Sequence, residues 1–139
     1  SVRYGHVYGP RQAPLGEAGV IASCCGKLRE GEQPTVFGDG LQTRDYVFVG
    51  DVVRANLAAA DSDATGAINI GTGVQSSVLD LIEALAPQAG GRFEANMAPE
   101  RPGEVRHIAL DATRAGELLG WSAEVGLADG LAVTLDSLR

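Results

Sequence analysis

Apolar residues recur along the chain at the spacings of helices and, elsewhere, in the short runs of strands. The segment Glu17–Leu28 places its apolar residues three and four positions apart, which predicts a helix with one buried face. These positions are Val20, Ile21, Cys24, Cys25 and Leu28. A similar stripe predicts a last helix; its members are Leu127, Leu131, Leu135 and Leu138.

Short polar residues mark the starts of two helices in the middle of the chain. Asp51 precedes the alanine-rich segment 52–60 and is expected to cap it, because a side-chain oxygen can accept from the free N–H groups of the first turn. Ser77 and Asp80 have the spacing of a capping box in front of the apolar segment 78–86. Both segments are therefore predicted to be helical.

A further helix is predicted over 112–120. Asp111 stands at its expected N-terminal cap, and Gly120 stands where a left-handed residue commonly ends a helix. Trp121 follows directly, at the position where this type of cap often makes an apolar contact. We expect Trp121 to be buried.

β-Branched and aromatic residues gather in short runs between these helices, and glycines follow several of the runs. Such runs predict strands. The predicted strands cover 2–8, 35–37, 46–49, 67–73 with its glycine turn, 92–95 and 107–110. Since strands and helices alternate irregularly, we expect a mixed fold of the α/β (or α+β) class, with residues 1–139 as a single unit.

Composition excludes several classes of function. The net charge of −7 disfavours non-specific nucleic-acid binding. No apolar run approaches the roughly 20 residues of a membrane span and no signal sequence opens the chain, which favours a cytoplasmic protein without a membrane partner. Two adjacent cysteines and two histidines offer no spacing typical of metal ligands, so no metal site is expected.

Several blocks along the chain together resemble the NAD-dependent epimerase/dehydratase family, the extended short-chain dehydrogenases/reductases. These blocks are RYGHVYGPRQ (3–12), GDGLQTRDYVFVGDVVRAN (38–56), NIGTG (69–73), PERPGEVRH (99–107) and LDATRAGELLGW (110–121). Their order resembles the C-terminal, substrate-binding half of the family. Nucleotide-sugar epimerases, dehydratases and decarboxylases share these blocks.

The resemblance implies NAD as the cofactor of intact family members, but the sequence does not contain the matching motifs. The family binds NAD at a Gly-x-x-Gly-x-x-Gly turn, and here Gly71 and Gly73 stand as a pair without the third glycine. None of the three tyrosines begins the family's Tyr-x-x-x-Lys pair. We therefore expect no catalytic residue in this chain and no NAD bound by the chain alone.

By resemblance, three charged residues bind the ligand, a nucleotide sugar of the UDP-glucose or UDP-galactose type. Arg44 and Arg101 match arginines that contact the diphosphate, and Glu104 matches an acidic residue that accepts from the ribose hydroxyls. Alternatively, Arg44 pairs with its neighbour Asp45 and stiffens the turn, and Arg101 with Glu104 belongs to a solvated loop. An exposed ion pair of that kind would contribute only about 0–1 kcal/mol.

The resemblance also assigns residues around the uracil and the nicotinamide. Thr35 and Phe37 match one wall of the uracil pocket, and the other wall is matched by Val20 and Ile21. All four could instead be ordinary core residues. Two residues match positions near the nicotinamide, namely Tyr4 and Gly5.

His6 departs from the family pattern, in which an asparagine donates to the substrate diphosphate. A neutral histidine can donate one hydrogen bond, and a protonated one attracts the diphosphate more strongly. Alternatively, the site is slightly altered in shape. His107 is expected to be a packed residue on a strand.

The start of the chain suggests that an upstream part is missing. Residues 1–10 resemble a late strand of the family's Rossmann half, which is otherwise absent. Its absence would leave an apolar surface uncovered, and such patches drive association. We therefore expect a homo-oligomer that uses this surface.

Overall fold

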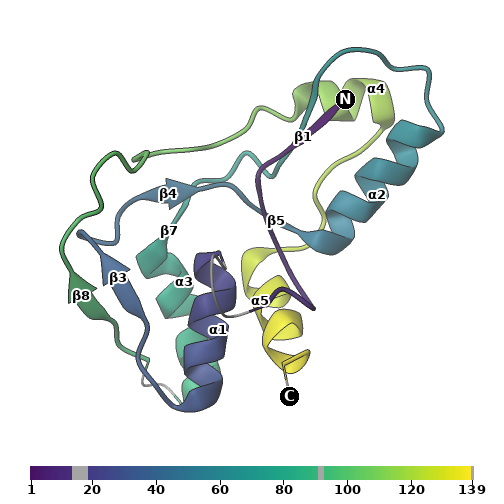
Figure 1. Cartoon of the computed structure of the whole chain (residues 1–139). Coiled ribbons are helices and arrows are strands. Elements are labelled where there is room, and N and C mark those ends of the chain that lie inside the picture. Colours follow the sequence, from purple (N-terminus) through teal and green to yellow (C-terminus); the bar gives the residue numbers. More distant parts are fainter. Residues whose placement is uncertain (14–18, 91–92, 139) are drawn as a thin grey trace.

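The computed structural model describes residues 1–13, 19–90 and 93–138 as a mixed α/β fold (Figure 1). Its helices are α1 (Val20–Glu30), α2 (Val49–Ala60), α3 (Val78–Leu85), α4 (Thr113–Leu119) and α5 (Leu127–Asp136), with a 3₁₀ turn, η1 (Ala86–Ala89). None of the helices in these ranges is long and apolar enough to cross a membrane.

The strands are short and join in pairs. Three pairs are parallel: β1 (Val2–Tyr4) with β6 (Ile68–Ile70), β2 (His6–Tyr8) with β5 (Tyr46–Phe48), and β3 (Thr35–Phe37) with β8 (Asn96–Ala98). The fourth pair is antiparallel and joins β4 (Thr43–Arg44) to β7 (Ser76–Ser77). Every pair joins segments distant in sequence, so the strands tie the chain together over long separations.

The first predicted strand, 2–8, is divided at Gly5. The Gly5 N–H donates to Ile70 O at 2.9 Å, which ends the pairing with β6, and His6 N donates to Asp45 O at 2.7 Å, which begins the pairing with β5. A Cβ atom at Gly5 would lie 2.7 Å from Asp45 O. The chain therefore changes partner where only glycine fits.

Two hydrophobic cores lie on opposite sides of β5. Tyr46 belongs to the larger core, which α1, α3 and α5 enclose, while Val47 belongs to the smaller one beneath α2 and α4. Successive side chains of a strand point to opposite faces, which explains how one short strand serves both cores. Figure 1 shows the same division, with α2 and α4 grouped apart from the other helices.

The predicted helices are present, with differences at their starts. Helix α1 is described from Val20, so the predicted start at Glu17 lies outside the described residues. The capping box is confirmed, since Asp80 N donates to Ser77 Oγ at 3.0 Å and Ser77 N donates to Asp80 Oδ2 at 2.7 Å. Leu138 lies beyond the end of α5 but still packs against the larger core.

Asp51 was expected to cap its helix, and this expectation is wrong. Helix α2 begins at Val49, two residues earlier, so Asp51 lies inside the first turn. Its carboxylate is instead buried and accepts from the backbone N–H groups of Glu124 and Val125, both at 3.0 Å. Asp51 thus ties α2 to the segment that precedes α5.

Helix α4 begins one residue later than expected and ends as predicted. Ala112 is its N-cap residue, and the Asp111 carboxylate accepts from Thr113 N at 2.9 Å. Gly120 is left-handed, and Trp121 N donates to Ala115 O at 3.2 Å. The Trp121 side chain is buried, as the cap predicts.

Two predicted strands are wrong. Residues 93–95 are not a strand, and the strand follows at Asn96–Ala98 as β8; Arg92 lies outside the described residues. In place of the strand 107–110, His107 forms a single bridge with Thr43. Both segments contain the right residues for strands, but their pairing depends on partners far away in sequence.

Candidate functional site

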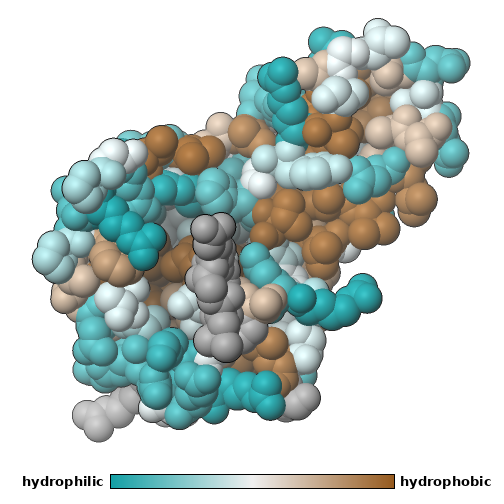
Figure 2. All heavy atoms as spheres, in the orientation of Figure 1, coloured by the Kyte–Doolittle hydropathy of each residue, from teal (hydrophilic) through white to brown (hydrophobic). Residues whose placement is uncertain are grey.

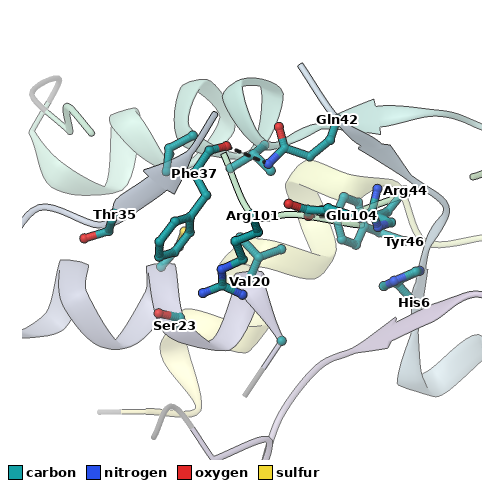
Figure 3. A pocket seen from close by; sticks show the side chains of 14 residues that line it. His6, Val20, Ser23, Thr35, Phe37, Gln42, Arg44, Tyr46, Arg101 and Glu104 are labelled. Atoms are coloured by element: carbon teal, nitrogen blue, oxygen red, sulfur yellow. Dashed lines mark hydrogen bonds and ion pairs between the residues drawn. The ribbon is translucent and has the colours of Figure 1, made fainter. Parts of the chain in front are cut away.

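A cavity of about 390 Å³ opens between α1, β3, β4 and the segment that follows β8 (Figure 3). It is lined by His6, Gly19, Val20, Ser23, Cys24, Thr35, Val36, Phe37, Gln42, Arg44, Tyr46, Val78, Arg101 and Glu104. Most of the ligand-binding residues proposed from the sequence are therefore together in one pocket. They come from segments up to about a hundred residues apart.

Arg44 lies largely inside this pocket, with its side chain 13% exposed. Its Nη2 donates to Glu104 Oε1 at 3.0 Å, and its Nη1 donates to Thr43 O at 2.8 Å. The two bonds hold the guanidinium at the cavity wall. A buried, oriented arginine of this kind suits the recognition of an anionic oxygen.

Asp45 does not pair with Arg44, so the alternative of a local ion pair is wrong. The Asp45 carboxylate is fully buried on another side and accepts hydrogen bonds from Thr72 and Gly73 and from Leu110 N. The bonds from Thr72 come from both its N–H and its hydroxyl, at 2.8 and 2.7 Å. Asp45 therefore fixes the turn after β6, and Arg44 faces the pocket.

Arg101 lies over the ring of Phe37, with Cζ 3.8 Å from the ring centroid. This is a cation–π contact, which holds a flexible side chain over an aromatic wall. Figure 3 shows Arg101 reaching across the pocket toward α1, while Arg44, Glu104, Tyr46 and His6 gather at the other end. Thus an aromatic end and a charged end face one cavity.

The segment 99–105, which carries Arg101 and Glu104, is attached at both ends. Gly38 N donates to Ala98 O at 2.9 Å before it, and Thr43 N donates to Arg106 O at 2.8 Å after it. The Arg106 guanidinium also donates to both carboxylate oxygens of Asp39, at 2.8 and 2.6 Å. These hydrogen bonds from Arg106 hold the pKa of Asp39 at about 2. The segment is thereby kept beside β3 and β4, where its side chains can reach the pocket.

His6 lines the charged end of the pocket, and part of the residue remains exposed to solvent. Its ring lies edge-on to Tyr46, with ring centroids 6.1 Å apart. Partial burial and the neighbouring Arg44 guanidinium lower the pKa of the His6 imidazole, and the Asp45 carboxylate partly opposes them. Burial also raises the pKa of the Tyr46 phenol, so Tyr46 is neutral.

The remaining residues proposed from the sequence divide into two groups. Val20 and Thr35 line the cavity together with Phe37. Ile21 does not, because its side chain is 2% exposed and packs in the larger core.

The two residues proposed to contact nicotinamide, Tyr4 and Gly5, lie outside the cavity lining. The Tyr4 hydroxyl donates to Asn56 Oδ1 at 2.8 Å, and Gly5 lies against the Asp45 backbone. Across the described ranges, no group of three or more His, Cys, Asp or Glu side chains could hold a metal ion.

Several lining residues were not predicted from the sequence. Gln42 is buried and donates from Nε2 to Phe37 O at 3.0 Å, while its Oε1 has no hydrogen-bond partner among the described residues. Ser23 and Cys24 face the cavity from α1. The helical spacing around Cys24 could have indicated a buried face, but not that part of this face is open to a pocket.

The order of the elements and the arginine-lined pocket agree with one protein family. The model of the NAD dependent epimerase/dehydratase family matches residues 1–71, about half of the chain, and the chain belongs to that family.

Individual proteins are similar to nearly the whole of this chain. The chain is 47% identical over 135 residues to the UDP-glucose 4-epimerase of Mycolicibacterium smegmatis, covering 96% of this chain and 43% of the relative. The structure of the Thermotoga maritima UDP-glucose 4-epimerase with UDP-glucose is 46% identical, with a TM-score of 0.95 over 99% of this chain and 45% of its own.

A further similar structure contains NAD. The UDP-glucose 4-epimerase of Thermus thermophilus, solved in complex with NAD, is 38% identical with a TM-score of 0.90, over 99% of this chain and 45% of its own. The chain thus spans less than half the length of the relatives that it matches.

Proposed function

We propose that this chain binds a UDP-sugar in the pocket around Arg44 and Arg101. We further propose that it is the substrate-binding part of an NAD-dependent enzyme similar to UDP-glucose 4-epimerase and is not catalytic on its own. The observation that carries the proposal is the convergence of Arg44, Arg101 and Glu104 on one cavity with an aromatic end. The reaction at the sugar would need residues that this chain does not contain.

The charged end of the pocket suits a diphosphate. Arg44 is 13% exposed, so a hydrogen bond from it to an anionic oxygen is shielded from water. Such a charge-assisted bond contributes about 1.5–3 kcal/mol, compared with about 0–1 kcal/mol for an exposed ion pair. The diphosphate would take the place of Glu104 on Nη2, and Glu104 would then be available to the ribose hydroxyls.

The aromatic end suits a nucleobase. The planar guanidinium of Arg101 already lies over one face of the Phe37 ring. Val20 and Thr35 stand beside it at the same end of the cavity. A planar base can pack against this stack of ring and guanidinium, and Arg101 can contact the ligand where the base and the diphosphate meet.

Calorimetric titration with UDP-glucose at low salt tests this proposal. We expect binding to the wild-type chain and a roughly ten- to hundredfold weaker affinity in Arg44→Ala. Arg29→Ala is the matched control, because Arg29 is an exposed arginine of α1 outside the cavity lining. Equal affinity of Arg44→Ala and wild type, or no heat of binding at millimolar UDP-glucose, would reject the site.

The same chain could instead be the corresponding part of a nucleotide-sugar dehydratase or decarboxylase. The pocket residues would then be the same, and the sugar would differ. Competition between UDP-glucose, UDP-glucuronic acid and dTDP-glucose separates these cases. We expect UDP-glucose to bind at least as tightly as the other two, and a clear preference for either of them would transfer the proposal to that class of enzyme.

A second candidate function is that of a non-catalytic, oligomerising module. The observation that favours it is the apolar face of α2, where Val53 and Leu57 are 52% and 62% exposed. Figure 2 shows hydrophobic side chains gathered over this part of the molecule. Light scattering over a range of concentrations tests it: a dimer that Leu57→Lys dissociates would support this function, and a monomer at high concentration would reject it.

A further inference from the structure

His6 stands beside the proposed diphosphate position, and its imidazole is free of hydrogen bonds from the described residues. It is the first residue of β2 and pairs in register with Tyr46 of β5. Its backbone N–H donates to Asp45 O at 2.7 Å. This bond fixes the position of the residue, while the ring remains available to a ligand. The ring lines the same end of the cavity as Arg44.

The charges that face His6 come from a small set of groups. The Arg44 guanidinium disfavours the imidazolium, and the Asp45 carboxylate favours it. The Asp45 charge is already shared among donors from Thr72, Gly73 and Leu110. The Tyr46 phenol beside the ring carries no charge, because burial raises its pKa. Hence, of the two charges that act on the ring, the Arg44 guanidinium outweighs the Asp45 carboxylate.

Other elements around His6 do not change this balance. Glu104 faces the cavity from the 99–105 segment, but its carboxylate is paired with Arg44 at 3.0 Å. Helix α2 also packs against β2, and its charged residues Asp51 and Arg54 are paired with each other at 2.6 Å. Cys24 of α1 is a buried thiol, and burial raises its pKa to about 12. None of these groups supplies a free negative charge to the imidazole.

Without a ligand the imidazole is therefore mainly neutral at pH 7, since burial and Arg44 lower its pKa below the ordinary value of about 6.5. A diphosphate between His6 and Arg44 reverses the sign of the local field. A negative charge within about 4–6 Å of an imidazole favours the protonated form and raises its pKa by roughly 1–3 units. The protonated ring would also donate from both of its nitrogens.

We propose that His6 takes up a proton when a ligand with a diphosphate enters the pocket, so that binding is tightest in mildly acidic solution. The proposal depends on the proposed function, because it needs an anion between His6 and Arg44. The proton comes from solvent and is returned when the ligand leaves. The affinity depends on pH only between the pKa of His6 in the free protein and the pKa of His6 in the complex. The total change in affinity is about tenfold for each unit by which these two pKa values differ.

The experiment is calorimetric titration of the whole chain with UDP-glucose, from pH 6 to pH 8, in pairs of buffers that differ in ionisation heat. UDP-glucose is a suitable probe because none of its own groups titrates in this range. For the wild type, we expect uptake of up to one proton and an affinity about tenfold higher at pH 6 than at pH 8. We expect His6→Asn to bind without proton uptake.

His107→Asn is the control, because His107 is the one other histidine of the sequence and its Nδ1 already lies 3.1 Å from Thr43 Oγ1. It should retain the proton uptake of the wild type. Proton-resolved NMR of the His6 imidazole should show its pKa rising on addition of UDP-glucose.

Two results would overturn the proposal alone: wild-type binding that does not depend on pH, or proton uptake that persists undiminished in His6→Asn. Absence of binding at every pH would overturn the proposed function and this proposal with it. The measurement thus separates failure of the site from failure of the proton linkage.

Discussion

Arg44 and Glu104 form an ion pair inside the pocket, with Arg44 Nη2 3.0 Å from Glu104 Oε1. Sixty positions separate them in sequence, and the pair joins β4 to the 99–105 segment. Glu104 is 28% exposed, so the pair is partly shielded from solvent. Each residue therefore occupies the charged group with which, in our proposal, the other contacts the ligand.

Glu104→Gln is expected to change ligand preference rather than simply weaken binding. The variant no longer repels an anion at Arg44, so inorganic pyrophosphate should bind several-fold more tightly. UDP-glucose gains the same advantage but loses the carboxylate that we propose accepts from its ribose hydroxyls, a loss of about 1.5–3 kcal/mol. Titration with both ligands should show the ratio of their affinities, UDP-glucose to pyrophosphate, falling about tenfold or more. An unchanged ratio would contradict the ribose contact.

Asp45→Asn should destabilise the fold without removing any pocket contact. The carboxylate accepts from the N–H groups of Thr72, Gly73 and Leu110 and from the Thr72 hydroxyl. The side-chain NH2 group of an asparagine would face one of these N–H or O–H groups and could not accept from it, at a cost of about 2–3 kcal/mol. Urea denaturation measures the change in the free energy of unfolding, and Asp63→Asn, at an exposed site, is the control. Equal effects of the two substitutions would refute a structural role for the Asp45 carboxylate.

The buried Asp51 carboxylate should make stability depend on acidity. Burial alone would raise its pKa, but hydrogen bonds from Arg54 and from the backbone N–H groups of Val125 and Glu124 outweigh burial and lower it. A carboxyl whose pKa is lower in the folded state stabilises the fold above its unfolded pKa, about 3.9, and this contribution is lost as the pH falls through the folded value.

We therefore expect the free energy of unfolding to decrease as the pH is lowered below about 4. The decrease should be steeper in the wild type than in Asp51→Asn. Urea denaturation at a series of pH values from about 5 to about 2 measures both slopes. Asp39 is an exposed carboxyl with a lowered pKa, so Asp39→Asn measures how much a surface carboxylate contributes to the pH dependence of stability. Identical slopes for wild type and Asp51→Asn would rule out the linkage.

Helix positions could be predicted from the sequence because they depend on local signals, and half of the residues that line the pocket could be predicted because they lie in stretches that resemble a family. The spacing of Val20, Cys24 and Leu28 places α1, and the capping box at Ser77 places the start of α3. The motif around Arg44 could be matched to a family, and the pocket contains its residues. These signals act over a few positions of the chain, so no distant partner is needed to read them.

The contacts between distant segments could not be predicted. The sequence places Asp45 beside Arg44, which suggests an ion pair, but successive side chains of an extended chain point to opposite sides. Asp45 consequently faces Leu110, and Arg44 faces Glu104. Similarly, Ile21 follows a pocket residue directly yet points into the core, since neighbouring positions of a helix lie on different faces.

Two glycine substitutions should have opposite effects on stability. A Cβ atom at Gly71, in the turn after β6, would lie 2.6 Å from Asp45 Oδ2 and 3.0 Å from Leu110 Cβ. Gly71→Ala must therefore displace the Asp45 carboxylate, and we expect it to cost about 1–3 kcal/mol, the range for strained core insertions. Gly116 lies inside α4, and its nearest neighbour, Trp121 O, would be 3.8 Å from the added Cβ. Gly116→Ala should stabilise the fold by about 0.5–1 kcal/mol, because alanine favours a helix interior. Urea denaturation of both variants checks the signs, and destabilisation by Gly116→Ala or tolerance of Gly71→Ala would contradict the packing described for that position.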